Sequence, residues 1–210
     1  MSSDGTPETP AASPPQGGAQ PAWGGPALAG AAPAAAADKV RLRPTMLSDL
    51  EFVTSVEQDA LNRPFITPWD RTQHEGAVRF PDFRHFIIEA GDGYPSVGFA
   101  ILQGCRNPHR SIELKRIVLQ PAAHGRGIGS ACIRWLAQMA FRDLGAHRFW
   151  LDVKARNTRA QALYLREGFV EEGRLRESVR TDDGYDALIV LAMLESEHTA
   201  LAAARDRSAE

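Results

Sequence analysis

The fold is decided by the stretch Leu119-Gln120-Pro121-Ala122-Ala123-His124-Gly125-Arg126-Gly127-Ile128-Gly129-Ser130. The hydrophobic pattern changes its period across these residues. Residues 111–119 read as a β-strand, and the apolar residues after the glycines recur at the spacing of an amphipathic helix. Glycines between a strand and a helix let an anion approach the unpaired amides of the helix start, as in a pyrophosphate cradle. Two other phosphate loops are excluded: Ser130 stands where GxGxxG needs glycine, and no GK[ST] follows.

The rest of the pattern predicts a mixed α/β (α+β) fold. Helices are expected over 50–61, 72–79, 128–139 and 158–167, with Thr45 and Ser48 as caps of the first and Gly168 as a left-handed C-cap of the last. The helical crossover between the fourth and fifth strands makes these two parallel in a mostly antiparallel, seven-stranded sheet with helices on both faces. The strands are expected at 40–44, 85–89, 96–105, 111–119, 147–153, 169–180 and 185–194. The proline-rich region 63–82 is mostly irregular and is a candidate wall of a substrate pocket.

Composition limits the classes of partner. Lys plus Arg (24) nearly balance Asp plus Glu (26), so no global field favours nucleic acid. No apolar run reaches the roughly 20 residues of a membrane span, which predicts no membrane partner. Cys105 and Cys132 lie far apart without a Cys or His companion, which predicts reduced thiols in a cytoplasmic protein and no metal. Cys132 falls on the apolar side of its helix and is expected in the core.

One domain is predicted over residues 39–198, which hold enough apolar side chains for a core. Residues 1–38 are rich in Pro, Ala, Gly and Ser, so a disordered tail is expected there. The same residues lack Lys and Arg, which argues against a signal peptide. Residues 199–210 are expected to form a C-terminal tail with a short frayed helix.

Two sequence patterns carry a family resemblance. The first is His124-Gly125-Arg126-Gly127-Ile128-Gly129, and the second is formed by Asn157, Ala160, Leu163, Tyr164, Gly168 and Phe169. With these patterns the chain resembles the GNAT superfamily of acetyl-CoA-dependent N-acetyltransferases over nearly all of residues 40–195. The first pattern matches the family's pyrophosphate signature, with His where the family has Gln or Arg, and the second signature is matched in full. The ending Gly173–Glu177 with Gly184–Leu188 is similar to the branch of ribosomal-protein N-terminal and polyamine acetyltransferases.

The resemblance implies a site for acetyl-CoA where the fourth and fifth strands splay apart. The backbone of Ile117, Val118 and Leu119 would hold the pantetheine and the acetyl carbonyl. Tyr164 would be the general acid, although a buried core tyrosine is an alternative. The other implied cofactor contacts are His124, Gly125, Arg126, Gly127, Ile128, Gly129, Ser130, Asn157 and Ala160. Asn157 could donate to the cofactor, cap the helix that follows it, or do both. Arg126 and Arg159 would reach the phosphates, with ordinary exposed arginines as the alternative reading.

Glu113 is the candidate general base, since some family members carry the base on this strand. Even spacing places Glu113 on the same face as Leu119. A paired surface carboxylate is the alternative reading, and Glu89 or a water molecule could serve as the base instead. No role is assigned to His85, His109 or His147, which show no partner in the sequence.

The leading prediction is therefore an enzyme that transfers the acetyl group of acetyl-CoA to a primary amine of a small molecule or a protein N-terminus. An acetyl-CoA sensor without turnover, and an acyltransferase that uses another acyl-CoA or a hydroxyl acceptor, remain as alternatives. The acceptor cannot be named from the sequence, and the resemblance also allows a homodimer.

Overall fold

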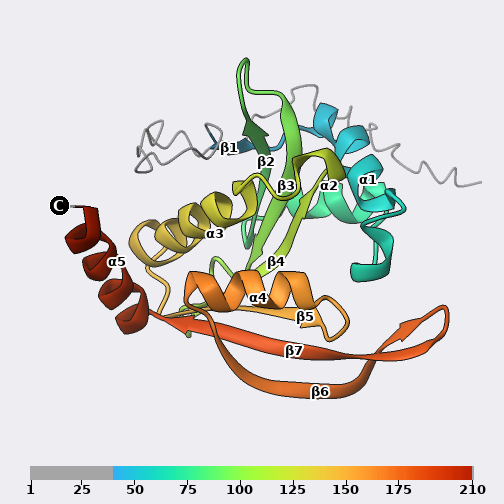
Figure 1. Cartoon of the computed structure of the whole chain (residues 1–210). Coiled ribbons are helices and arrows are strands. Elements are labelled where there is room, and N and C mark those ends of the chain that lie inside the picture. Colours follow the sequence, from blue (N-terminus) through green and yellow to red (C-terminus); the bar gives the residue numbers. More distant parts are fainter. Residues whose placement is uncertain (1–39, 210) are drawn as a thin grey trace, which may run out of the picture. The chain divides into compact units, whose positions relative to one another are not determined.

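The computed structural model describes residues 40–209, so the predicted disordered tail lies outside the described residues. The chain forms one seven-stranded sheet in the order β1-β2-β3-β4-β5-β7-β6 (Figure 1). Every neighbouring pair is antiparallel except β4 and β5, which are parallel as predicted. The strands are β1 (Val40–Pro44), β2 (Phe83–Ala90), β3 (Ser96–Gln103), β4 (Ser111–Leu119), β5 (Arg148–Lys154), β6 (Val170–Thr181) and β7 (Gly184–Leu194).

Helices cover both faces of the sheet, as expected (Figure 1). The larger hydrophobic cluster packs α3 and α4 onto one face, where Phe86, Leu136 and Phe149 are buried. A smaller cluster, including Leu50 and Phe99, packs α1 against the other face of β2, β3 and β4. The α-helices are α1 (Leu50–Gln58), α2 (Arg71–Arg79), α3 (Ile128–Gln138), α4 (Thr158–Glu167) and α5 (Glu195–Ala209). The short 3-10 helices η1 (Leu47–Asp49), η2 (Arg63–Phe65) and η3 (Pro121–Ala123), and the π-helix η4 (Met139–Asp143), complete the set within residues 40–209.

The pairing of β4 with β5 ends early. Only residues 111–113 of β4 pair with residues 148–150 of β5, although both strands continue. Beyond this point the two strands run in clearly different directions (Figure 1). The predicted splay is therefore present, and it opens at the C-terminal end of β4, where the glycine-rich turn begins.

A β-bulge at Lys115 changes which residues of β4 share a face. Ile101 of β3 pairs with Arg116, whereas the next residue of β3, Leu102, pairs with Leu114, so Lys115 is the extra residue. Side-chain direction alternates along a strand, and an inserted residue reverses the alternation after it. The prediction that Glu113 shares a face with Leu119 was therefore wrong.

Most element boundaries agree with the sequence patterns. The fourth strand (Ser111–Leu119) and the helix Thr158–Glu167 begin and end at the predicted residues. Gly168 ends α4 in the left-handed region, at φ 103°, as expected for a glycine C-cap. The predicted caps of the first helix were wrong, because the Thr45 hydroxyl lies 2.9 Å from Nδ1 of His85 and no side chain caps α1.

The predicted C-terminal helix is present, but it starts earlier than residue 199 and packs against the domain. Helix α5 begins at Glu195, and its residue Leu201 packs against the large core cluster beside Gly168. A Cβ at Gly168 would lie 2.2 Å from Cδ1 of Leu201, so glycine is needed there for close approach as well as for its φ angle. His198 stacks on Phe141, with ring centroids 4.8 Å apart. Within residues 40–209, no helix is long and apolar enough to span a membrane.

Candidate active site

The glycine-rich turn has the backbone conformation that an anion cradle requires. Gly125 and Gly127 adopt left-handed φ angles of 76° and 78°, which residues other than glycine rarely adopt. The first helical hydrogen bond runs from the amide of Ala131 to the carbonyl of Gly127 at 3.1 Å. The amides just before Ala131 therefore lie in the first turn, where no carbonyl of the helix can accept from them. A Cβ built on Gly125 meets no atom within 4 Å, so space is open beside the turn.

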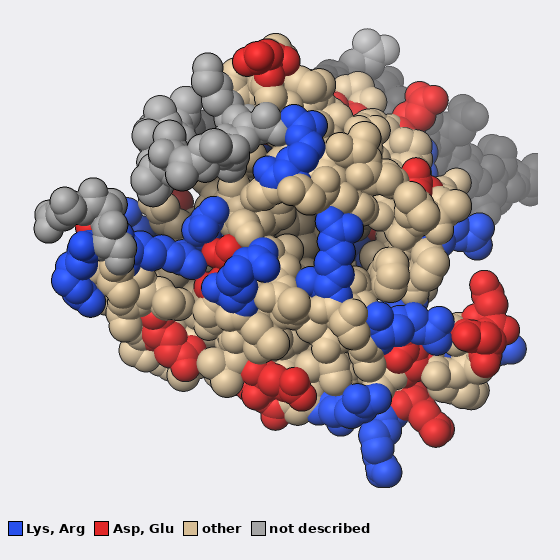
Figure 2. Space-filling view, in the orientation of Figure 1, with Lys and Arg blue, Asp and Glu red and all other residues tan. Residues whose placement is uncertain are grey.

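The packing of α3 against α4 places this turn next to the second family pattern. A Cβ at Gly129 would lie 3.2 Å from Cδ2 of Leu163, so the glycine lets the two helices approach closely. The face that carries these helices has Lys and Arg side chains around a hollow near the middle of the view (Figure 2). Positive charge around such a hollow favours a polyanionic ligand.

His124 is engaged within the turn itself. Its Nε2 lies 3.2 Å from the carbonyl oxygen of Leu119, which also accepts a hydrogen bond from Nδ2 of Asn62 at 3.0 Å. The imidazole thus holds the end of β4 to the start of the turn. Ser130 is a further predicted contact, and its hydroxyl accepts from Arg166 at 3.2 Å. Contacts of these residues and of Arg126 with a cofactor stay predictions.

The register of β4 indicates which backbone amides face the gap. The amide of Gln120 donates to the carbonyl of Val97 at 2.8 Å, and antiparallel ladders alternate hydrogen-bonded and non-bonded pairs. This alternation directs the backbone of Val118 toward β3, and that of Ile117 and Leu119 toward the side of β5. Val118 contributes its side chain to the cluster beneath α1. Among the three predicted residues, Ile117 and Leu119 are thus better placed to meet a ligand in the gap.

Tyr164 lies on α4 at the edge of the large core and is buried. Its ring packs against Phe169, with centroids 5.8 Å apart. Burial raises the pKa of Tyr164, and the negative charge of Asp152 raises it further. The hydroxyl therefore stays protonated well above neutral pH, as a proton donor must. Asn157 caps the same helix, because its side-chain oxygen accepts from the amide of Ala160 at 3.2 Å.

The two carboxylates that the sequence suggested as bases are both paired. Glu113 is buried at the last residue of β4 that pairs with β5, and it accepts a hydrogen bond from Nζ of Lys115 at 2.9 Å. Glu89 on β2 is held by Arg41 and Arg43 at 2.8 Å each. Burial would raise the pKa of Glu89, but the two guanidinium groups outweigh it and lower the pKa overall.

Asp152 is a carboxylate that the sequence reasoning missed. It lies on β5 two residues beyond Trp150, the last residue paired with β4, and it is exposed. Its carboxylate makes no hydrogen bond or ion pair within the described part of the chain, yet its charge acts on both Tyr164 and Arg116. A signal was present, since Asp152 interrupts an apolar strand between Leu151 and Val153.

A buried polar network also escaped the sequence reasoning. His85 was expected to have no partner, and this was wrong: its Nε2 lies 3.2 Å from Nδ1 of His74, and its Nδ1 contacts Thr45. Burial, and then the neighbouring His74, lower the pKa of His85 to about 3, so its ring is neutral. The network continues from His74 to Glu57, at 3.5 Å.

The cysteines do not enter the site. Cys132 is buried in the large cluster as predicted, and burial raises the pKa of its thiol. Burial also raises the pKa of Cys105 to about 11. Neither thiol ionises appreciably near neutral pH, so neither is a nucleophile here.

The profile of the Acetyltransferase (GNAT) family matches residues 50–169, which is more than half of the chain. The chain belongs to this family of acetyltransferases. The match includes both the glycine-rich turn and the segment from Asn157 to Phe169.

Similar proteins include two bacterial N-acetyltransferases. The chain is 26% identical to spermidine N(1)-acetyltransferase of Vibrio cholerae serotype O1 over 171 residues, covering 76% of this chain and 95% of that protein. It is 25% identical over 154 residues to the putative alanine N-acetyltransferase for ribosomal protein bS18 of Bacillus subtilis (strain 168), covering 72% and 94%. Both kinds of relative agree with the branch that the sequence suggested.

The fold is also that of solved acetyltransferase structures. The crystal structure of spermidine N-acetyltransferase from Vibrio cholerae in complex with CoA and spermine superposes with a TM-score of 0.70 at 24% identity. The superposition covers 76% of this chain and 98% of that one. This likeness supports the architecture of sheet and helices described above.

A substitution at Gly127 tests whether the glycine-rich turn binds the pyrophosphate. Gly127→Glu places a charged side chain at a left-handed position beside the expected pyrophosphate, so acetyl-CoA binding should be lost. Calorimetric titration with acetyl-CoA measures this, and circular dichroism checks that the variant is folded. Wild-type affinity in a folded Gly127→Glu protein would contradict the anion-cradle assignment.

Proposed function

We propose that this protein is an N-acetyltransferase that moves the acetyl group of acetyl-CoA to a primary amine of a small molecule or a protein N-terminus. The observation that carries the proposal is the gap between β4 and β5, which opens toward the glycine-rich turn before α3. Tyr164 on α4 is proposed to border the same gap. The family membership supports an acyl transfer at this gap.

The reaction has three steps that the protein must support. The neutral amine attacks the thioester carbonyl, the tetrahedral intermediate expels the CoA thiolate, and the amine proton is taken up by a base. The amides of Ile117 and Leu119 are proposed to stabilise the oxyanion, and the turn from Gly125 to Ser130 to hold the pyrophosphate. Tyr164 is proposed to donate a proton to the thiolate.

The acceptor is proposed to be a primary amine because relatives named for such acceptors cover most of this chain. A cytoplasmic location, the absence of a metal and a homodimeric state are further proposals from the sequence. The competing functions are an acetyl-CoA sensor and an acyltransferase with a different acyl-CoA or a hydroxyl acceptor.

Thiol release separates these functions. The full chain is mixed with acetyl-CoA and a panel of spermidine, amino acids and peptides with free N-termini, and free thiol and acetylated product are followed. We expect thiol release that depends on an amine, with one acetyl group added per thiol. Tight acetyl-CoA binding without amine-dependent release would identify a sensor, and faster release from a longer acyl-CoA would reassign the donor.

Tyr164→Phe tests the general acid. General acid or base groups contribute about a hundredfold to ten-thousandfold, but a thiol of pKa roughly 8.5 is already a good leaving group. The raised pKa of Tyr164 makes proton transfer less favourable still. We therefore expect turnover to fall only about tenfold to a few hundredfold, with acetyl-CoA affinity little changed. Full turnover in the Phe variant would leave Tyr164 as a packing residue.

Two carboxylates compete for the role of base, Glu113 from the sequence and Asp152 from the structure. Lys115 already neutralises Glu113, whereas Asp152 is unpaired beside the gap. Asp152→Asn is expected to lower kcat/KM for the amine by about a hundredfold, and Glu113→Gln by about tenfold or less. The opposite order would assign the base to Glu113, and small effects from both variants would point to water.

A further inference from the structure

The loop of residues 62–69, between α1 and α2, is tied to both of the strands that diverge. From β5, Nζ of Lys154 donates to the carbonyls of Pro64 and Ile66 at 3.2 and 3.3 Å. From β4, the guanidinium of Arg116 donates to the carbonyl of Thr67 at 2.7 Å. Nδ2 of Asn62 reaches the carbonyl at the end of β4 as well.

All of these strand residues lie beyond the last paired residues of β4 and β5. Arg116 shares its face with its partner Ile101, which belongs to the cluster beneath α1. The loop therefore crosses the gap on the face of α1 and α2, whereas α3 and α4 pack on the opposite face. A cofactor held by the turn before α3 and an acceptor that meets it in the gap would thus approach from different sides.

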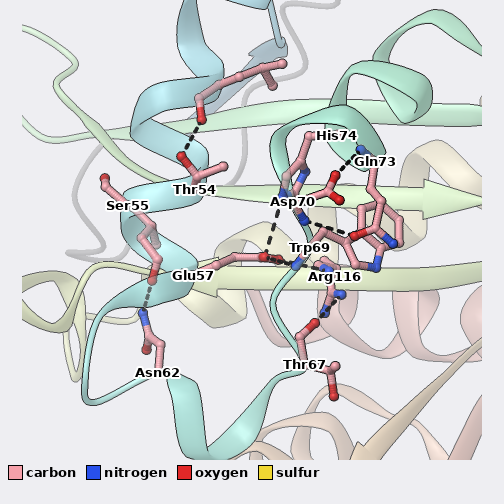
Figure 3. A network of polar contacts seen from close by, with 12 residues as sticks. Thr54, Ser55, Glu57, Asn62, Thr67, Trp69, Asp70, Gln73, His74 and Arg116 are labelled. Atoms are coloured by element: carbon pink, nitrogen blue, oxygen red, sulfur yellow. Dashed lines mark hydrogen bonds and ion pairs between the residues drawn. The ribbon is translucent and has the colours of Figure 1, made fainter.

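A buried ion pair fixes the far end of this loop (Figure 3). Glu57 is fully buried, and its carboxylate accepts from the amide of Trp69 at 2.7 Å. Nε of Arg116 lies 2.9 Å from the other carboxylate oxygen, and the guanidinium lies over the Trp69 ring, 4.7 Å from its centroid. A buried ion pair adds little net stability. Its main effect here is geometric, because it fixes the position of the loop end and of Trp69.

We propose that Lys154, Arg116 and Glu57 are positioning residues, which hold loop 62–69 across the gap as the acceptor-side wall of the thioester site. The proposal rests on the acetyltransferase function proposed above. Lys154 is the critical member: among the described residues, the hydrogen bonds from β5 to this loop come from Lys154 alone. Without it the loop keeps its contacts with β4 and α1 but loses its tie to β5, so the gap opens to water and the amine loses its orientation.

Lys154→Met tests the proposal, because methionine keeps most of the side-chain length and removes the donor. Hydrogen exchange of residues 62–69 should become about tenfold faster, while α3 and β4 keep their protection. With the amine that the wild type acetylates, kcat/KM for that amine should fall about ten- to a hundredfold, since misplacement of an acceptor wall costs that much. Hydrolysis of acetyl-CoA without amine should rise, and acetyl-CoA affinity should stay within about twofold of wild type.

Two further variants complete the test. Lys154→Arg keeps donors at this site and should restore most of the protection and activity. Arg79→Met removes an exposed positive charge at the end of α2 and should change neither. Unchanged exchange in residues 62–69 of Lys154→Met, or an equal loss of acetyl-CoA and amine affinity, would overturn the positioning role.

The exchange measurement also separates this proposal from the proposed function. If no amine is acetylated by the wild type, the acetyltransferase assignment fails, and the acceptor-side role fails with it. Faster exchange in Lys154→Met would then show that the loop is anchored as described. If the wild type is active and Lys154→Met loses neither protection nor amine kcat/KM, only the positioning role fails.

Discussion

The rest of the site depends on one constraint, which is that β4 and β5 stop pairing after three residues of each strand. Strands that continue without a partner leave backbone donors and acceptors that need other partners. The carbonyl of Leu119 accepts hydrogen bonds from the side chains of Asn62 and His124. The ladder with β3 leaves the amides of Ile117 and Leu119 directed into the gap, where a ligand can meet them.

The bulge at Lys115 determines which side chains of β4 lie on each side of this gap. Past the bulge, Ile117 and Leu119 face the large core under α3 and α4, while Arg116 faces α1 and the 62–69 loop. The glycine-rich turn follows on the α3 side, where the amides of the first helical turn have no carbonyl of the helix as partner. Charged side chains then gather on the other side, where Asp152 and Lys154 extend from β5. The inserted residue thus sets which side chains of β4 lie on the side proposed for the cofactor and which lie on the side proposed for the amine.

The sequence predicted the elements whose signals are local. The strand at 111–119 and the helix at 158–167 were placed correctly because period and caps identify them without tertiary information. The parallel pairing of β4 and β5 followed from the crossover helix between them. The predicted face of Glu113 was wrong because a bulge shows no reliable pattern in the sequence. One extra residue moves every later side chain of the strand to the opposite face.

Contacts between distant residues could not be read in the same way. His85 and Thr45 are 40 residues apart, and only the β1–β2 pairing and the packing of α2 bring them together with His74. The same holds for Lys154 and Pro64, which are 90 residues apart. The start of α5 at Glu195 and its packing were missed because its contacts, through His198 and Leu201, are also tertiary. Intrinsic propensity alone is a weak guide for such a segment.

The central claim is that the gap between β4 and β5, with the turn that follows, receives acetyl-CoA. Hydrogen exchange followed by mass spectrometry, with and without saturating acetyl-CoA, tests it most directly, because bound ligand protects the amides it contacts. Slower exchange is expected in peptides covering residues 116–120 and 124–131, with β1, β6 and α5 unchanged. Protection confined to other segments, with these two peptides unaffected at saturation, would contradict it.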